Sequence, residues 1–180
     1  MSDTNIGSFF GLAVREQYLF VGHREKGLQV YDVSDMTKPE RVAENGSKGG
    51  IKRIALAGNV LIAGRITGRN RSEWIDIYDV SDPLNPRFVS EIPGECNYGL
   101  AVKGDYMYAA SYYAGSQWLF FDISDIKNPK QIWSWRGYHP TGVAIEGRYI
   151  YASCLASITV FDAPVSGEYP RGRVTVECGE

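Results

Sequence analysis

Apolar and polar residues alternate with a period of two in several short segments of this chain, and the same phase returns along it. Leu28 and Val30 alternate with Gln29 and Tyr31, and residues 75–79 repeat the pattern. This is the period of a β-strand, whose successive side chains point to opposite faces of a sheet. Because apolar residues fall on both faces, we expect sheets that are covered on both sides.

A five-residue phrase marks the repeats. Tyr31-Asp32-Val33-Ser34-Asp35 returns at 78–82, and again at 121–125 with Phe and Ile in place of Tyr and Val, while a degraded copy occupies 161–164. The first aspartates of successive copies lie 40 to 47 residues apart. A period in this range is typical of repeat folds in which each unit buries its apolar faces against its neighbours.

Each unit begins with two predicted strands joined by a tight turn. The first strand is built of small residues, at 11–14, 53–56, 99–102 and 142–145. The second is aromatic and β-branched, at 18–21, 60–63, 106–109 and 149–152. Three of the turns contain Gly58, Gly104 or Gly147, which suits a hairpin that needs a positive φ. The first unit has Glu16 instead, and we therefore expect a different turn type there.

Two further strands complete each unit. The third strand ends at the first aspartate of the phrase, and the fourth follows Pro39, Pro86 or Pro129. In the last unit the fourth strand is expected after an insertion, at 173–176. Four antiparallel strands per unit, joined by short loops and repeated radially, predict an all-β fold, a β-propeller with four four-stranded antiparallel blades.

The predicted blades fill one domain, with approximate boundaries at 7–49, 50–95, 96–138 and 139–180. Such a chain could form a four-bladed ring, or half of an eight-bladed dimeric ring made by two chains head to tail. No strand is left over to close a ring by exchange between its ends. We therefore favour a homodimer.

Residues 27–35, with the later Pro39, resemble the LVIVD-repeat family of β-propellers. The second and third units match as well, and 82–86 is especially close to the loop of the family. The fourth unit departs from the pattern, because Pro164 and Val165 stand where the first unit has Ser34 and Asp35. The resemblance implies the propeller fold and little about function, since propellers host unrelated activities.

Composition narrows the classes of partner. The net charge of -2 over 180 residues gives no reason to expect nucleic acid or an anionic membrane. No apolar run is long enough to cross a bilayer, and the first residues lack the pattern of a secretory signal. Three cysteines do not make a disulfide framework. We expect a cytoplasmic protein without a cofactor, with secretion still open if a signal has been removed.

The aspartates of the phrase invite a metal or catalytic interpretation. They occur once per blade at equivalent places, so they would lie apart around a ring rather than converge. An aspartate that ends a strand can accept hydrogen bonds from the backbone N–H groups of the following turn. We therefore expect these residues to serve the scaffold.

A propeller collects distant residues at the mouth of its channel, which the first strand of each blade lines. By alignment, Phe10, Lys52, Tyr98 and Thr141 stand at the entrance, and Arg53 replaces the glycine of the other units. The neighbouring loops contribute His23, Arg24, Arg65, Arg69, Arg71, Cys96, Tyr112, Tyr113, His139 and Cys154. The predicted ligand-binding residues are Lys52, Arg53, Tyr98, His139, His23, Arg65 and Tyr112.

Three functions fit this mouth. The first is a non-enzymatic binding module for a protein or a small anionic ligand, because Lys52 and Arg53 suit a carboxylate, a phosphate or an acidic peptide. The second is a small hydrolase, lyase or cyclase, with His139 or His23 as acid/base, Tyr98 or Tyr112 as proton donor and the two cations as a clamp. The third is a sugar-binding propeller that uses exposed aromatic side chains.

A metal site is not predicted. Both histidines, with Cys96 and Cys154, match the ligand inventory of tetrahedral zinc, but they lack the paired close spacing of a zinc motif. No nucleophile elbow, phosphate loop or zincin motif is present. Whether the chain is an enzyme is therefore open at this stage.

Overall fold

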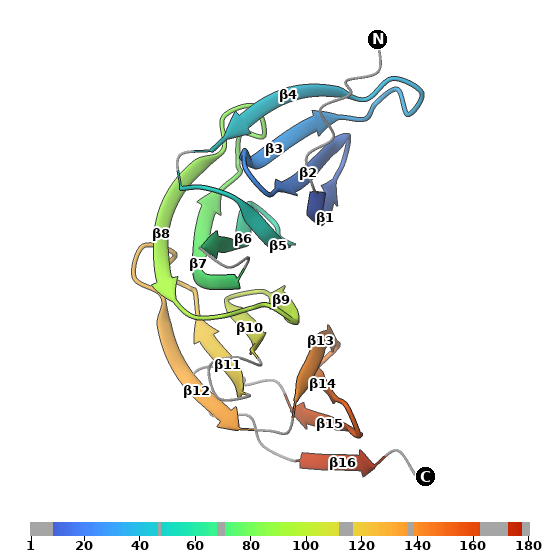
Figure 1. Cartoon of the computed structure of the whole chain (residues 1–180), viewed down its shortest axis with the longest axis vertical. Helices are drawn as coiled ribbons and strands as arrows, with labels where there is room; N and C mark the ends of the chain where they lie inside the picture. The colour runs from blue at the N-terminus through green and yellow to red at the C-terminus, as the bar shows by residue number, and fades with distance from the viewer. Residues whose placement is uncertain are drawn as a thin grey trace. The chain divides into compact units, whose positions relative to one another are not determined.

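Four antiparallel sheets of four strands make up the computed structural model, which describes residues 9–46, 48–67, 71–111, 117–136, 139–162 and 173–177 (Figure 1). In each sheet the strands follow chain order. Blade 1 contains β1 (Phe9–Arg15), β2 (Tyr18–His23), β3 (Gly27–Asp32) and β4 (Glu40–Asn45). Blade 2 contains β5 (Ile51–Ala57), β6 (Val60–Thr67), β7 (Arg71–Asp79) and β8 (Arg87–Pro93).

The second half of the chain repeats this order. Blade 3 contains β9 (Gly99–Lys103), β10 (Tyr106–Ser111), β11 (Gln117–Asp122) and β12 (Lys130–Arg136). Blade 4 contains β13 (Pro140–Glu146), β14 (Tyr149–Cys154), β15 (Ser157–Asp162) and β16 (Arg173–Glu177). The predicted all-β fold of four four-stranded propeller blades is confirmed. The chain divides into two compact units, residues 1–93 with blades 1 and 2 and residues 94–180 with blades 3 and 4.

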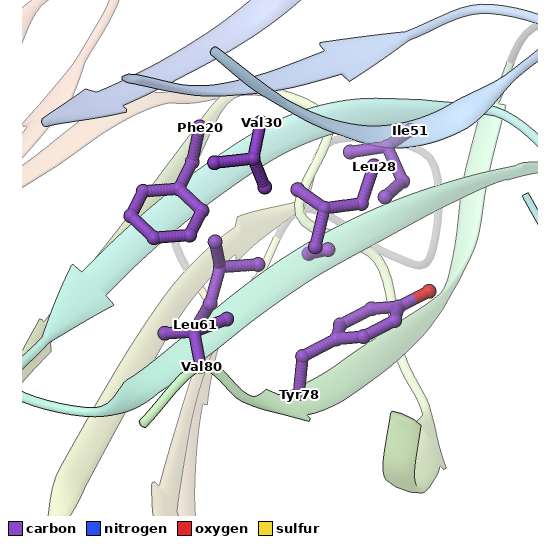
Figure 2. Close-up of a cluster of buried hydrophobic side chains, with 8 residues drawn as sticks. Phe20, Leu28, Val30, Ile51, Leu61, Tyr78 and Val80 are labelled. Carbon is purple, nitrogen blue, oxygen red and sulfur yellow. The ribbon is translucent and has the colours of Figure 1, made fainter. Parts of the chain in front are cut away.

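In the first unit, one face of blade 1 packs on one face of blade 2. We call the packed side of blade 1 face A, and it carries Phe20, Leu28 and Val30. The packed side of blade 2 is face B, and it carries Leu61, Tyr78 and Val80. All six side chains are buried in one cluster together with Ile51 (Figure 2). We call such a contact between face A and face B a seam.

The second unit contains a seam of the same kind. Face A of blade 3 contributes Trp118 and Phe120, and face B of blade 4 contributes Ile150 and Phe161. The rings of Phe120 and Phe161 meet edge to face, with centroids 6.2 Å apart. Trp135 of β12 stacks on Trp118 with centroids 4.5 Å apart and also reaches Phe161 at 5.2 Å. Aromatic packing between the blades therefore accounts for this tryptophan.

Glycine lets the first strands of neighbouring blades approach closely within each unit. A Cβ atom on Gly11 of β1 would lie 2.7 Å from the backbone nitrogen of Ile54 in β5. A Cβ atom on Gly99 of β9 would lie 2.8 Å from the backbone nitrogen of Val143 in β13. Side-chain carbons do not approach backbone atoms this closely, so the strand spacing at both seams requires glycine.

A cation at the end of the first strand closes each seam. The guanidinium of Arg15 donates hydrogen bonds to the carbonyl oxygens of Gly58 at 2.8 Å and of Val80 at 2.6 Å. In the second unit, the ammonium group of Lys103 donates to the carbonyl oxygen of Gly147, which is the residue equivalent to Gly58. The polar edge of the seam thus repeats along with its apolar core.

The aspartates of the repeated phrase hold the turn after the third strand. The carboxylates of Asp32, Asp79 and Asp122 each accept a hydrogen bond from the backbone N–H two residues later, at 2.8 to 2.9 Å. Hydrogen bonds from Ser34 hold the pKa of Asp32 below its ordinary value. The second aspartates, Asp35 among them, do the same in the next turn. The expected structural role is confirmed for the aspartates of blades 1 to 3.

The turn at Glu16 differs from the expectation. Glu16 has a φ of 55°, against 54° at Gly58, 54° at Gly104 and 55° at Gly147. The first unit therefore uses the same turn as the others, and the prediction of a different turn type is wrong. The two flanking strands impose the turn geometry, so a non-glycine residue at this position has to adopt the left-handed conformation.

Replacing Glu16 with glycine should therefore stabilise the protein by about 0.5–1 kcal/mol, because the side chain no longer opposes the backbone conformation. Urea-induced unfolding of Glu16→Gly and wild type measures this difference. Gly58→Ala, at the equivalent position of blade 2, is the matched control and should lose a similar amount. An unchanged or lower stability for Glu16→Gly would show that the turn is not strained.

Candidate functional site

A bulge at the start of the first strand presents one extra residue in three blades. The register between the first and second strands shifts between Phe9 and Gly11, between Ile51 and Arg53, and between Pro140 and Gly142. The extra residues are Phe10, Lys52 and Thr141. In blade 3, Tyr98 precedes β9 and donates its backbone N–H to the carbonyl oxygen of Ala110 at 3.2 Å. The four aligned positions are therefore equivalent within their blades.

Blade 2 differs from the other blades at this position in charge. Lys52 and Arg53 follow one another at the start of β5 and are both half-buried. The other blades carry an uncharged residue followed by glycine, at 10–11, 98–99 and 141–142. Arg65 of β6 lies directly across from Ile51, so three cations gather at this end of the β5–β6 pair.

Arg65 is engaged with acidic residues of its own blade. Its side chain is 12% exposed, and its Nη2 donates to Oε2 of Glu91 at 2.8 Å. Its Nε lies 3.6 Å from Oδ1 of Asp76, and its guanidinium lies over the ring of Trp74. Lys48 adds a second cation 3.5 Å from Oε2 of Glu91. The positive charge of Arg65 is therefore balanced within blade 2 by carboxylates of β7 and β8.

Asp76 is the most unusual member of this cluster. Its side chain is fully buried, and neither carboxylate oxygen accepts a hydrogen bond from the residues that the structure describes. Burial raises the pKa of Asp76 from 3.8 to about 6, although the nearby Arg65 acts in the opposite direction. For Glu91, burial opposes ionisation, but Arg65 and Lys48 outweigh it and the pKa is lowered.

His23 holds a turn in blade 1. The side chain is 3% exposed, and its Nδ1 accepts hydrogen bonds from the backbone N–H groups of Glu25 at 3.0 Å and Lys26 at 3.1 Å. Because Nδ1 is an acceptor, a neutral ring carries its proton on Nε2. The rings of Phe9 and His23 pack in a T-shaped pair, with centroids 5.1 Å apart. This turn lies beside the chain that enters β5, since a Cβ atom on Gly50 would overlap the carbonyl oxygen of Arg24.

In the second unit, the structure describes Tyr98 and His139, both half-buried, whereas Tyr112 lies outside the described residues. His139 has a φ of 50° and immediately precedes β13. Of the seven predicted ligand-binding residues, Lys52, Arg53, His23 and Arg65 thus belong to the first unit and Tyr98 and His139 to the second.

A polar group beside Tyr98 was missed by the sequence analysis. The hydroxyl of Ser111 donates to Oε2 of Glu95 at 2.6 Å, and the amide of Asn97 lies 3.4 Å from the same oxygen. Ser111 and Asn97 are buried, as is Cys96. The contributing residues come from the end of β10 and from the segment before β9, so no local motif announces them. In the sequence, the one feature that could have indicated this polar group is Ser111, which ends β10 and is followed by two tyrosines.

The described residues contain no group of three or more His, Cys, Asp or Glu side chains that could hold a metal ion. Nor do these residues include a helix that is long and apolar enough to cross a membrane.

Comparison with known proteins identifies the repeat and the fold. Residues 6–44, which contain most of blade 1, match the family model of the LVIVD repeat. The predicted resemblance to LVIVD-repeat propellers is thereby confirmed on this segment. No curated protein matches the sequence.

Among solved structures, the chain is similar to the computationally designed Ika4 protein, with a TM-score of 0.67 and 10% identity over 90% of this chain and 95% of that one. It is similar to the designed Ika8 protein with a TM-score of 0.65 and 11% identity, over 89% of this chain and 47% of that one. A functionally unknown protein from Desulfotomaculum acetoxidans gives a TM-score of 0.75 and 9% identity, over 96% of this chain and 57% of that one. The chain thus spans about half the length of the last two, and the likeness concerns the fold alone.

The buried acid of blade 2 predicts a pH dependence of stability. Asp76 is an acid whose pKa is higher in the folded than in the unfolded chain. Its ionisation therefore destabilises the fold progressively as the pH rises from about 4 to about 6, and the loss persists above that range. Asp76→Asn removes this dependence. Its stability relative to wild type should rise by roughly 2–3 kcal/mol between about pH 4 and about pH 7.

Urea unfolding of both proteins at the two pH values gives this difference. Asp35→Asn is the matched control, because Asp35 is exposed and the pKa of its carboxyl group is lowered by hydrogen bonds from Thr37. A difference between Asp76→Asn and wild type that stays constant with pH would contradict the burial argument.

Proposed function

We propose that this β-propeller with an LVIVD repeat is a binding module, and that Lys52 and Arg53 of blade 2 contact an anionic group of its ligand. The observation that supports the proposal is the placement of two adjacent, half-buried cations on the bulge that starts β5. The equivalent residues of the other three blades are uncharged. If this position had only a structural role, glycine would suffice in blade 2 as it does in the other three blades. We therefore attribute the arginine at position 53 to ligand binding.

The chemistry of the pair favours a carboxylate or a phosphate. A guanidinium presents a planar fork of donors that matches two anionic oxygens, and an adjacent ammonium group adds a second charge. Arg65 is assigned a supporting role, because Glu91 and Asp76 already balance its charge. His23 is likewise assigned to the scaffold, where it fixes the turn beside the entry to β5. The assignment of Tyr98, His139 and Tyr112 to the ligand site remains a prediction from the sequence.

The described contacts of His23 and of the blade 3 aromatic rings bear on the two alternative functions. The enzyme alternative calls for a histidine within hydrogen-bond reach of a tyrosine, whereas Nδ1 of His23 is taken by two backbone N–H groups. The sugar-binding alternative calls for exposed aromatic rings. The large rings of blade 3 pack against one another and against Phe161. Exposed aromatic side chains lie in blades 1 and 4, at Phe9, Phe10, Tyr149 and Tyr151.

The double variant Lys52→Ala/Arg53→Ala tests the proposed site. Citrate, inorganic phosphate and a hexaglutamate peptide serve as probes in calorimetric titrations at low salt. We expect wild type to bind at least one probe and the double variant to bind it at least about tenfold more weakly, since each charge-assisted contact contributes about 1.5–3 kcal/mol. The thermal midpoint should change little.

Lys38→Ala/Arg41→Ala is the matched control. It also removes two positive charges, from exposed positions that are ion-paired with Glu40 and Glu44 in blade 1. This variant should bind the probes as wild type does. Equal weakening in both double variants would mean that only net charge matters, and unchanged binding in Lys52→Ala/Arg53→Ala would sink the site.

A further inference from the structure

Face A of blade 4 exposes apolar side chains across several of its strands. The exposed fractions are 39% for Tyr151, 44% for Ile158, 64% for Val174 and 58% for Val176. The cross-strand register joins Ile158 to Val176, so these residues lie side by side on one face. An open hollow on this face is lined by Gly142, Ala144, Tyr151 and Ile158, among others. Contiguous exposed apolar surface of this kind marks a place where another surface binds.

The exposure of Ile158 is specific to blade 4, because the equivalent strand position is buried in the other three blades. Residues equivalent to Ile158 are 0% exposed at Leu28, 0% exposed at Ile75 and 1% exposed at Trp118. In blades 1 and 3 these residues belong to the seams with blades 2 and 4. The sequence of blade 4 therefore carries the apolar face of a seam.

A glycine on the same face points to the same conclusion. Gly142 is equivalent to Gly11 and Gly99, which allow the first strand of the next blade to approach within van der Waals contact. At Gly142, a Cβ atom would meet, among the described residues, only the hydroxyl oxygen of Ser153 in the same blade, at 3.1 Å. Blade 4 is thus shaped for the approach of a further first strand.

Face B of blade 1 is the complementary surface. Leu12 is 64% exposed and Val14 is 63% exposed. The residues equivalent to Leu12 are Ile54 in blade 2 and Val143 in blade 4, and both pack against the core clusters of the seams. Face A of blade 4 and face B of blade 1 are therefore exposed, and each is of the kind that the internal seams bury.

We propose that face A of blade 4 binds face B of blade 1 of a second copy of this chain. Two copies related by a two-fold axis would form two identical seams, since each copy supplies one face of each kind. The internal seams give the register, because Leu28 shares a cluster with Ile54 and Trp118 shares one with Val143. Ile158 of one copy is accordingly placed against Leu12 of the other.

One residue makes the seam between copies weaker than the internal ones. Glu146 ends β13 at the position where Arg15 ends β1 and Lys103 ends β9. Those two cations donate to a carbonyl oxygen of the next blade, which a carboxylate cannot do. Glu146→Lys should supply the missing donor and tighten the association between copies.

Analytical ultracentrifugation of the full chain at about 50 µM tests the assembly, and mass action favours the dimer at this concentration. The chain mass is 20.0 kDa. Wild type should therefore sediment as a species of about 40 kDa. Ile158→Asp alone and Leu12→Lys alone should each be monomeric, with the dimer at least about a hundredfold weaker, because each places an unpaired charge in both seams.

Mixing the two variants tests which faces pair. In the mixed dimer, one seam is wild type, and the other sets the carboxylate introduced by Ile158→Asp against the ammonium group introduced by Leu12→Lys. Because opposite charges meet there, the mixture should recover a species of about 40 kDa, which also shows that both variants are folded. If face A paired with face A, Leu12→Lys alone would remain dimeric, and that result overturns the proposal.

Leu84→Asp is the matched control, because Leu84 is 54% exposed and lies on neither face, in the loop between β7 and β8. It should sediment as wild type does. Glu146→Lys should lower the dissociation constant about tenfold. A wild-type species near 20 kDa at every concentration, or a mixture that stays monomeric, contradicts the proposal.

Discussion

The close approach of neighbouring first strands is the contact on which the rest of the structure depends. Gly11 against Ile54, and Gly99 against Val143, bring two backbones together where no side chain fits. At this spacing face A of one blade and face B of the next can bury their aromatic and β-branched residues completely. The cations that close the seam, Arg15 and Lys103, reach the next turn for the same reason.

Most of the fold could be predicted from the sequence because each blade repeats the same local rules. The alternation of apolar positions predicted where the strands lie, and the aspartate phrase predicted where the turns lie. In these turns, Asp32 and its equivalents accept hydrogen bonds from the backbone as expected. The exception is Glu16. Its residue type indicates a different turn, but the register of β1 with β2 imposes a φ of 55°. Tertiary geometry here overrides local preference.

The candidate site was predicted only in part. Alignment of the repeats was sufficient to place Lys52 and Arg53 at the start of a first strand, because that position is fixed by the register. The ion pairs of Arg65 could not be inferred from the sequence. In the sequence, Asp76 looks like an ordinary polar position of an alternating strand, and Glu91 lies on a different strand. His23 accepts hydrogen bonds from backbone N–H groups only two and three residues away. No sequence pattern around His23 indicates this local turn. The Glu95–Ser111 pair likewise joins the end of β10 to the segment before β9, where no strand pattern guides a prediction.

The most direct test of this account is the free energy of unfolding of Gly11→Ala and Gly99→Ala, measured with urea. The added methyl group would lie within 3 Å of the next strand, so the account predicts a loss of at least about 2 kcal/mol in each variant. Gly142→Ala, made in the Ile158→Asp chain so that the proposed seam between copies cannot contribute, should lose far less. If Gly11→Ala and Gly99→Ala unfold at the wild-type urea concentration, strand approach through glycine does not hold the blades together.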